Sequence, residues 1–219
     1  LSGLKVVVST GTKNLEEQIF FKDIPFLKKH LGVSFRATYM KGRTNYLCLL
    51  RYRNFLRQPT FEFARDAGYL KSISRWAART KTGDRTEIKD LPDDYAPWRD
   101  LTATADQCLG SKCPDFDHCF ITIMRRKAQE ADLVIVNHHL FFADLALRGK
   151  GIGGEVIPRY DAVIFDEAHG IEDVATEYFG IGISNWRIEE LERDAVKELA
   201  KAKTHDANIE RGLLGLEAC

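Results

Sequence analysis

Short apolar runs separated by helical stretches dominate the pattern of hydrophobic and polar positions along the chain. The apolar runs predict four strands, at Lys5–Val8, Phe35–Met40, Asp132–Val136 and Ala162–Phe165. Apolar residues at helical spacing predict helices over residues 14–31, 49–79 and 120–129. Pro25 predicts a break or a new first turn within the first of these helices. Strands that alternate with helices indicate an open α/β sheet.

Residues 80–118 interrupt this alternation. They are rich in Gly, Pro, Asp and Thr, a composition that buries little surface unaided, so the segment needs a stabilising cross-link. We expect an insertion in the sheet domain here, a glycine-rich loop over residues 149–154, and an amphipathic helix with a frayed end over the last 35 residues. The candidate core positions before the irregular segment are Tyr52, Phe55, Leu56, Phe63, Leu70, Ile73 and Trp76.

Composition is that of a globular protein. The 219 residues are 44% hydrophobic and 11% aromatic, which is enough for one or two domains. No apolar stretch approaches the roughly 18 residues of a membrane span, and we expect a soluble, cytoplasmic protein. The chain begins at Leu1 and its first residues do not resemble a signal peptide, so we expect a truncated gene product.

The zero net charge conceals an uneven distribution. Residues 1–60 hold 11 Lys and Arg against 3 Asp and Glu, a net +8, and residues 131–219 hold 9 against 17, a net −8. The segment between them balances at 12 against 12. The first quarter is therefore a candidate polyanion surface, unless its cations form only a solvated face.

Four of the five cysteines form a C-x59-C-x4-C-x5-C pattern, namely Cys48, Cys108, Cys113 and Cys119. Clustered cysteines without a secretory signal more often bind metal than form disulfides. Four thiolates suit either zinc or an iron-sulfur cluster, and the spacing favours the cluster because paired C-x2-4-C knuckles are absent. Four unligated cysteines are the remaining alternative. Cys219 is expected to be a bystander.

Acidic residues follow the fourth predicted strand in the string Asp166-Glu167-Ala168-His169, which has the form of a Walker B strand of the DEAH type. At such a strand end, Asp166 would hold Mg²⁺ through water and Glu167 would orient the water that attacks the γ-phosphate. His169 would couple the nucleotide site to the nucleic-acid side. The sequence contains no G-x-x-x-x-G-K-[ST] loop, so we expect these residues alone not to hydrolyse ATP.

Several segments resemble, in order, motifs of the DinG-type iron-sulfur helicases, bacterial relatives of the XPD helicase, and look closest to the YoaA branch. These segments are Val7–Leu15 (VVSTGTKNL), Lys41–Cys48 (KGRTNYLC), Cys108–Pro114 with Cys119-Phe120, Asn137–Leu140 (NHHL) and Asp166–His169 (DEAH). The resemblance covers nearly the whole chain. It implies an internal piece of a longer protein, because family members carry a Walker A loop upstream and a second motor domain downstream.

The resemblance also implies an organisation of the chain. Residues 1–40 would begin a RecA-like first helicase domain of the P-loop NTPase type with a parallel sheet, and residues 41–129 would form an inserted, mainly helical iron-sulfur cluster domain. Residues 130–175 would return to the helicase domain with the DEAH box, and residues 176–219 would start a helical Arch domain. The four cysteines would then hold a 4Fe-4S cluster.

Residue roles carry over from the resembling motifs. Thr10, Thr12 and Lys13 match the motif that grips single-stranded DNA, although they could only cap the following helix. Arg43 and Tyr46 resemble residues beside the DNA path, and Tyr46 could equally belong to the core. His138 and His139 are interpreted as positioning groups rather than as a metal pair.

The full-length protein implied is a superfamily 2 DNA helicase that uses ATP and Mg²⁺, moves 5′ to 3′ and acts on single strands and DNA junctions in repair or replication, near the bacterial nucleoid. One alternative is a non-catalytic nucleic-acid-binding module with a structural four-cysteine zinc site. Another is an iron-sulfur nuclease, for which these residues show no cluster of carboxylates.

Overall fold

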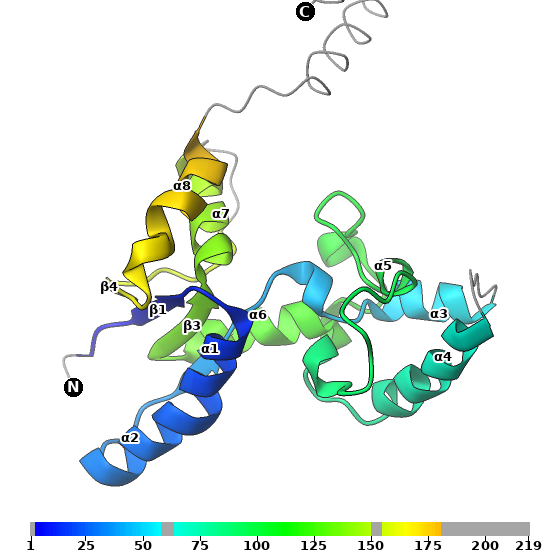
Figure 1. The fold of residues 1–219 in the computed structure, drawn as a ribbon, viewed down its shortest axis with the longest axis horizontal. Helices are drawn as coiled ribbons and strands as arrows, with labels where there is room; N and C mark the ends of the chain where they lie inside the picture. Colours follow the sequence, from blue (N-terminus) through cyan, green and yellow to red (C-terminus); the bar gives the residue numbers. More distant parts are fainter. Residues whose placement is uncertain (1–2, 58–63, 150–154, 181–219) are drawn as a thin grey trace, which may run out of the picture. The chain divides into compact units, whose positions relative to one another are not determined.

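Four parallel strands form one sheet in a computed structural model that describes residues 3–57, 64–149 and 155–180 (Figure 1). The strands are β1 (Val6–Thr10), β2 (Ala37–Tyr39), β3 (Leu133–Asn137) and β4 (Ala162–Phe165), in the order β2-β3-β1-β4. All three strand pairings are parallel, so each needs a crossover connection, and helices supply much of that chain. The predicted α/β class is confirmed.

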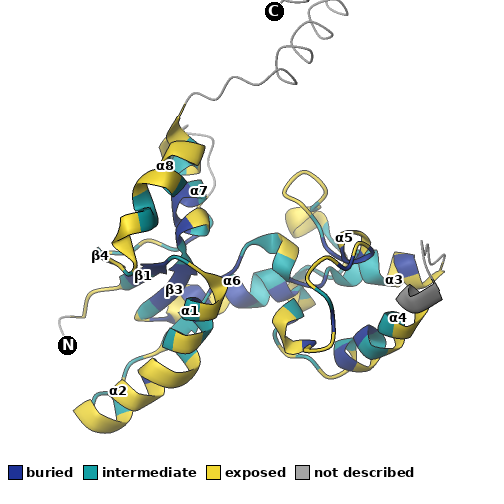
Figure 2. Cartoon of the chain, viewed as in Figure 1, coloured by how far each residue is buried: buried dark blue, intermediate teal, exposed yellow. Residues whose placement is uncertain are grey.

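The sheet core lies along the two central strands. Val7 is 1% exposed, and Ile135 and Val136 of β3 are fully buried (Figure 2). These apolar runs are continuous because helices and chain cover both faces of a central parallel strand. Strand β4 lies at one edge, where Ile164 is 55% exposed.

The first crossover consists of three helical segments rather than one. Helix α1 (Lys13–Gln18) passes into a π-helical segment (Ile19–Asp23) and then into α2 (Ile24–Leu31). Pro25 lies in the first turn of α2, where its missing N–H costs nothing, so the predicted new turn is correct. The π-helical segment was not predicted, because apolar spacing does not distinguish it from an α-helix. Gly32 ends α2 in the left-handed conformation with φ of 62°.

Between β2 and β3 lies a largely helical insertion. Its helices are α3 (Leu49–Arg57), α4 (Ala64–Ala77), α5 (Trp98–Leu101) and α6 (Phe120–Glu130), with 3₁₀ turns at Arg43–Asn45, Arg85–Glu87, Gly110–Lys112 and Phe116–His118. Phe55, Ile73 and Trp76 are buried as predicted. Leu56 is 43% exposed, which corrects the prediction that it belongs to the core. Phe63 lies outside the described residues.

The irregular part of the insertion buries more than its composition indicated. Its buried residues include Ile88, Leu91, Tyr95, Trp98 and Leu101. Trp98 Nε1 also donates to the carbonyl of Thr44 at 2.8 Å, and Thr102 Oγ1 donates to the carbonyl of Tyr46 at 2.9 Å. The segment therefore has an apolar cluster of its own, tied by hydrogen bonds to the chain that precedes Cys48.

Two further helices complete the described chain. Helix α7 (His138–Gly149) follows β3 directly, and α8 (Ile171–Phe179) follows β4 after a 3₁₀ turn at Ala168–Gly170. The chain divides into two compact units, Leu1–Val174 and Ala175–Cys219. Residues 150–154 of the expected glycine-rich loop and the expected amphipathic helix near the C-terminus lie outside the described residues. Among the described helices, none has the length and apolar character needed to cross a membrane.

Candidate functional site

The carboxyl ends of β1, β3 and β4 bring three sequence motifs to one edge of the sheet. The register pairs Thr10 with Asn137 and Ser9 with Phe165, so the residues that follow each strand emerge side by side. In parallel α/β sheets this edge is where ligands bind. The edge therefore brings Ser9-Thr10-Gly11 next to the loop that starts at Asp166.

Asp166 is fixed at this edge by two hydrogen bonds to β1. Its backbone N–H donates to the carbonyl of Ser9 at 2.8 Å, and its Oδ2 accepts from Thr10 Oγ1 at 3.0 Å. Thr10 is fully buried and Asp166 is half-buried. One carboxylate oxygen is thus oriented by the protein, which is the preorganisation that a metal-binding carboxylate requires.

Glu167 has an unusual backbone conformation. Its φ of 53° and ψ of 46° place it in the left-handed region, and among the described residues it is the sole non-glycine with positive φ. Such a residue costs on the order of 1–3 kcal/mol, and strain of this kind clusters at active sites. A Cβ at Gly11 would lie 3.7 Å from Glu167 Cβ, so the two backbones face each other closely.

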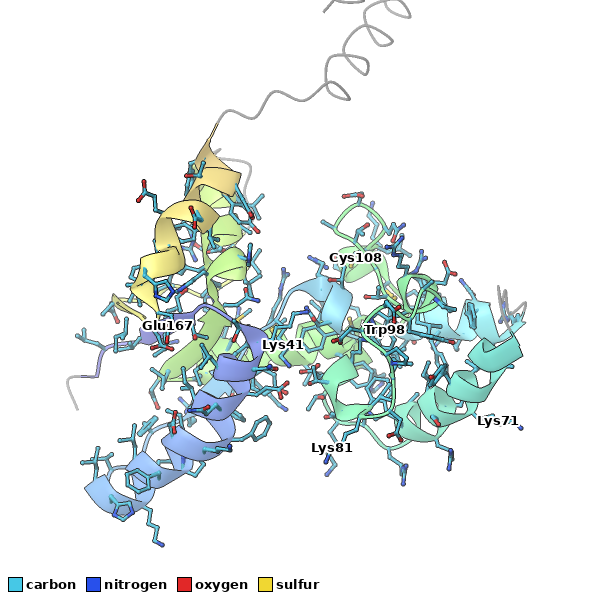
Figure 3. All side chains as sticks on the ribbon, viewed as in Figure 1. Lys41, Lys71, Lys81, Trp98, Cys108 and Glu167 are labelled. Atoms are coloured by element: carbon cyan, nitrogen blue, oxygen red, sulfur yellow. The ribbon has the colours of Figure 1, made fainter. Side chains whose placement is uncertain are left out.

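Glu167 lies on the loop that follows β4 (Figure 3). Its side chain is 49% exposed, and its Oε2 lies 3.2 Å from His169 Nδ1, whose side chain is 82% exposed. The catalytic candidates Asp166, Glu167 and His169 are thus brought together, with Asp166 anchored and the other two accessible to solvent.

His138 lies beneath this loop. Its Nδ1 is 2.7 Å from Ser9 Oγ, and both side chains are buried. Burial lowers the pKa of His138, although hydrogen bonds with the backbone of Asp166 and Glu167 favour the charged ring. The ring is therefore neutral at neutral pH. His139 is exposed, so the two adjacent rings occupy different environments. The Ser9–His138 pair was not predicted, because nothing in the sequence links residues so far apart.

The proposed DNA contacts fall into two environments. Thr12 and Lys13 are exposed at the start of α1, where Thr12 Oγ1 accepts from the N–H of Leu15 at 3.3 Å as the helix N-cap. Thr10 is buried against Asp166, and Tyr46 is 2% exposed with its hydroxyl accepting from the N–H of Lys41. Tyr46 is therefore a core residue in this structure, the alternative left open by the sequence.

All four predicted ligands line one cavity of about 310 Å³ in the insertion. Cys48, Cys108, Cys113 and Cys119 are half-buried and their thiols are free. Burial raises the pKa of the Cys48 thiol, and the neighbouring Cys119 and Cys113 raise it further, which is expected of sulfurs that approach one another. Figure 3 shows Cys108 on the loop of this cavity.

Short turns position the sulfurs. Cys48 donates its N–H to the carbonyl of Leu101 at 2.8 Å, and Cys113 closes a turn on Gly110 at 3.0 Å. Gly110 has φ of 57°, a conformation that glycine adopts without strain. Cys119 is the N-cap of α6. Sequence segments more than 50 residues apart, one of them the irregular loop, thus meet at the cavity.

The cavity lining is cationic as well as thiol-rich. Arg43 and Arg125 both contribute to it, and burial lowers the pKa of Arg125, whose Nε is buried without a hydrogen-bond partner. In the part of the chain that the structure describes, no three His, Cys, Asp or Glu side chains are placed to hold a single metal ion. Four cysteine sulfurs and four guanidinium groups, those of Arg43, Arg51, Arg125 and Arg126, line the cavity, a donor set that suits an anionic thiolate-bound metal centre.

The parallel sheet, with an Asp-Glu pair at the carboxyl ends of its strands, has the architecture of a partial RecA-like domain, the fold class of the P-loop NTPases. Comparison with known proteins agrees. Residues 90–188 match the DEAD_2 family. The ATP-dependent DNA helicase YoaA of Haemophilus influenzae is 42% identical over 192 residues, which cover 88% of this chain and 30% of that protein.

Two further relatives give the same result. The ATP-dependent DNA helicase YoaA of Escherichia coli is 39% identical over 197 residues, covering 87% of this chain and 30% of the relative. The ATP-dependent helicase DinG of Mycobacterium tuberculosis is 30% identical over 189 residues, covering 78% and 28% respectively. The chain belongs to the DinG/YoaA-type helicase family. It spans about 30% of the length of these relatives.

Proposed function

We propose that the chain forms part of the first motor domain of an ATP-dependent DNA helicase of superfamily 2. The observation that carries this proposal is the contact between the end of β1 and the DEAH loop, where Thr10 binds Asp166 and Gly11 faces Glu167. The names of the relatives, which are ATP-dependent helicases, support it. The full-length protein would use this edge to connect nucleotide hydrolysis with DNA movement in repair or replication.

Each residue of the edge has a defined chemical task in this proposal. Asp166, held by Thr10, would hold Mg²⁺ through a water molecule, and the ion would supply positive charge to the phosphates of ATP. Glu167 orients the attacking water and accepts its proton. His169 lies 3.2 Å from Glu167 and responds to DNA, so that hydrolysis follows DNA binding. Thr12 and Lys13 at the exposed start of α1 contact DNA phosphates.

The cysteine cavity is the second part of the proposal. Cys48, Cys108, Cys113 and Cys119 would hold a 4Fe-4S cluster, with Arg43 and Arg125 balancing its negative charge. When bound, the cluster supplies four strong metal–thiolate bonds that cross-link the insertion. The residues themselves fix Cys48 to Leu101 and Cys119 to α6, and would keep the insertion stiff at the DNA junction.

Hydrolysis can be tested at Glu167 in the full-length protein. Glu167→Gln should lower the turnover of ATP by about 10²–10⁴-fold, the usual contribution of a general base, with ATP binding retained. Asp173→Asn is the matched control, because it also changes an exposed carboxylate in the segment after β4. Unwinding of duplexes with either a 5′ or a 3′ tail then tests the proposed 5′-to-3′ direction. Turnover that survives Glu167→Gln would refute the assigned role.

Metal analysis tests the cluster separately. Anaerobically purified protein should contain about four irons and the brown absorbance of the cluster, and Cys113→Ser should lose both. Cys219→Ser is the control, since that cysteine is not a proposed ligand. One zinc in place of iron would support the alternative of a structural zinc module. Equal iron in the wild type and Cys113→Ser would mean that the ligands are assigned wrongly.

A further inference from the structure

A fully buried lysine joins the first crossover to the insertion. Lys41 Nζ donates to Asp84 Oδ2 at 2.8 Å, to Glu17 Oε1 at 2.7 Å and to Thr86 Oγ1 at 3.1 Å. The side chains of Lys41 and Asp84 are both 0% exposed, and that of Glu17 is 34% exposed. All three donor protons of the ammonium are used, so its position is fixed by partners on two different parts of the fold.

The charge of this lysine is retained despite burial. Burial opposes the ammonium, but the hydrogen bonds and charges of Asp84 and Glu17 outweigh it and raise the pKa of Lys41 above its ordinary value. The Tyr39 ring adds a cation–π contact, with Nζ 5.2 Å from the ring centroid. Charged-group hydrogen bonds in a poorly hydrated site are stiff and directional. Lys41 and its partners Asp84, Glu17 and Thr86, here called the joint, therefore form a rigid connection.

On the insertion side, the joint leads toward the cysteine cavity. Asp84 forms a β-bridge with Tyr46, and the N–H of Leu47 donates to the carbonyl of Gly83 at 2.9 Å. Leu47 immediately precedes Cys48. Asp84 Oδ1 also accepts from the N–H of Thr86 at 3.0 Å, which starts the 3₁₀ turn. A displacement of the cavity wall at Cys48 must therefore displace Asp84.

On the sheet side, the joint leads toward the DEAH loop. Glu17 belongs to α1, a helix of six residues whose N-cap is Thr12. Gly11 precedes this cap, and a Cβ placed on Gly11 would lie 3.7 Å from Cβ of Glu167. A short, rigid helix moves as a unit, so a pull on Glu17 is transmitted to Thr12, Lys13 and the backbone beside Glu167. Figure 3 labels Lys41 at the start of the insertion.

We propose that Lys41 is a positioning residue that couples DNA engagement by the insertion to ATP hydrolysis at the DEAH loop, an inference that rests on the proposed helicase function. Asp84 is its partner on the insertion and Glu17 its partner on α1. Force or displacement at the insertion reaches the start of α1 through these two ion pairs. Breaking the joint leaves both sites intact and disconnects them.

The test compares Lys41→Met with Lys81→Met in the full-length protein. Methionine keeps most of the length of the side chain without its charge, and Lys81 is an exposed lysine of the same insertion (Figure 3). ATP turnover is measured with and without single-stranded DNA, and iron content reports on folding of the insertion. Lys41→Met should lower the stimulation by DNA at least about fivefold, the lower end of couplings between sites, with unstimulated turnover and iron unchanged. Lys81→Met should resemble the wild type.

Stimulation equal to the wild type in an iron-loaded Lys41→Met protein would overturn the proposal. If Lys41→Met does not fold, Glu17→Gln decides the matter, because it weakens the α1 side of the joint and leaves the Lys41–Asp84 pair in place. Lost stimulation with full iron content in Glu17→Gln supports the joint, and unchanged stimulation refutes it.

A wild-type protein whose ATP turnover does not respond to DNA would refute the proposed function rather than the joint. Amide hydrogen exchange then tests the contacts of Lys41 independently of ATP turnover. Lys41→Met should speed amide exchange in Lys13–Gln18 and in the Arg85–Glu87 turn together, because Lys41 Nζ donates to Glu17 on one side and to Asp84 and Thr86 on the other. Exchange that speeds up in α1 only, or in neither segment, would overturn the mechanical link.

Discussion

Gly83 offers a sharp test of how the insertion is assembled. Its φ of 68° is left-handed, and a Cβ at this position would overlap Cγ and Cδ2 of Phe120 and lie 2.8 Å from Cε2. Phe120 is 7% exposed and directly follows Cys119, while the carbonyl of Gly83 accepts from the N–H of Leu47. Gly83→Ala therefore perturbs both chain segments that bring sulfurs to the cavity.

The magnitude follows from two separate costs. A non-glycine residue in the left-handed region costs about 1–2 kcal/mol. Relief of the overlap with a buried ring requires shifts that cost about 1–3 kcal/mol. The free energy of unfolding should thus fall by about 2–5 kcal/mol, a large share of the roughly 5–15 kcal/mol of a typical domain. Iron content should fall with it.

Gly32→Ala is the matched control. Gly32 also has a left-handed φ, of 62°, but a Cβ there would meet nothing within 4 Å. Gly32→Ala should lower the free energy of unfolding only by the cost of the left-handed conformation, about 1–2 kcal/mol. Urea unfolding followed by circular dichroism measures both variants, and the difference between them isolates the Phe120 overlap. If the two variants are destabilised equally, the overlap is relieved without cost and the reasoning fails.

Three more predictions concern buried polar groups. Burial raises the pKa of Glu16 from 4.5 to about 8, so the folded state keeps a proton that the unfolded state releases. The free energy of unfolding should therefore fall as pH rises from 4.5 to about 8, by at most about 1.4 kcal/mol per pH unit, and urea unfolding of Glu16→Gln should show a flatter slope. Thr10→Val removes the donor to Asp166 and should cost about 1.5–3 kcal/mol in the same assay, whereas no loss would mean that the hydroxyl is not needed. Asp144→Ala removes the acceptor of the Val156 and Ile157 N–H groups, at 2.7 and 3.0 Å, and should cost at least about 1–3 kcal/mol; full stability would show that other acceptors replace it.

The sequence predicted the sheet well because each strand is an apolar run between polar residues. The predicted strand Ala162–Phe165 has the observed bounds, whereas the strand predicted at Lys5–Val8 is observed at Val6–Thr10. Ser9 and Thr10 lay outside the predicted strand. They belong to the strand because β1 lies between β3 and β4, with Asn137 of β3 opposite Thr10 and Phe165 of β4 opposite Ser9. Long-range pairing of this kind overrides the turn preference of Ser and Thr.

The buried residues were predicted less well than the helical segments. Leu27 and Leu56 sit at helical core spacing, but they are 40% and 43% exposed. Spacing identifies an apolar face of a helix and does not say which part of that face a partner covers. In contrast, Lys41 and Asp84 would have been assigned to the surface by residue type, and both are fully buried because they neutralise each other.

The candidate site divides in the same way. The DEAH string and the cysteine spacing are local in sequence, so the residues could be named beforehand. The Ser9–His138 and Thr10–Asp166 contacts join residues 129 and 156 positions apart, and only the fold reveals them. The assignments of Thr12, Lys13 and Arg43 to DNA stay predictions, and the assignment of the four cysteines to a cluster is tested by the iron content of Cys113→Ser.

The place where the insertion joins the sheet has a consequence for how this fold can change. The chain leaves the sheet at Met40, whose N–H donates to the carbonyl of Ile135 at 2.9 Å, and it returns to the neighbouring strand at Leu133, opposite Ala37. Exit and return thus lie on neighbouring strands, at the carboxyl end of β2 and at the amino end of β3. Residues between these points can lengthen, shorten or acquire a metal while the strand register stays the same, because that register depends on β1, β2, β3 and β4 alone. The insertion can therefore change in length or content without a change in the sheet that carries it.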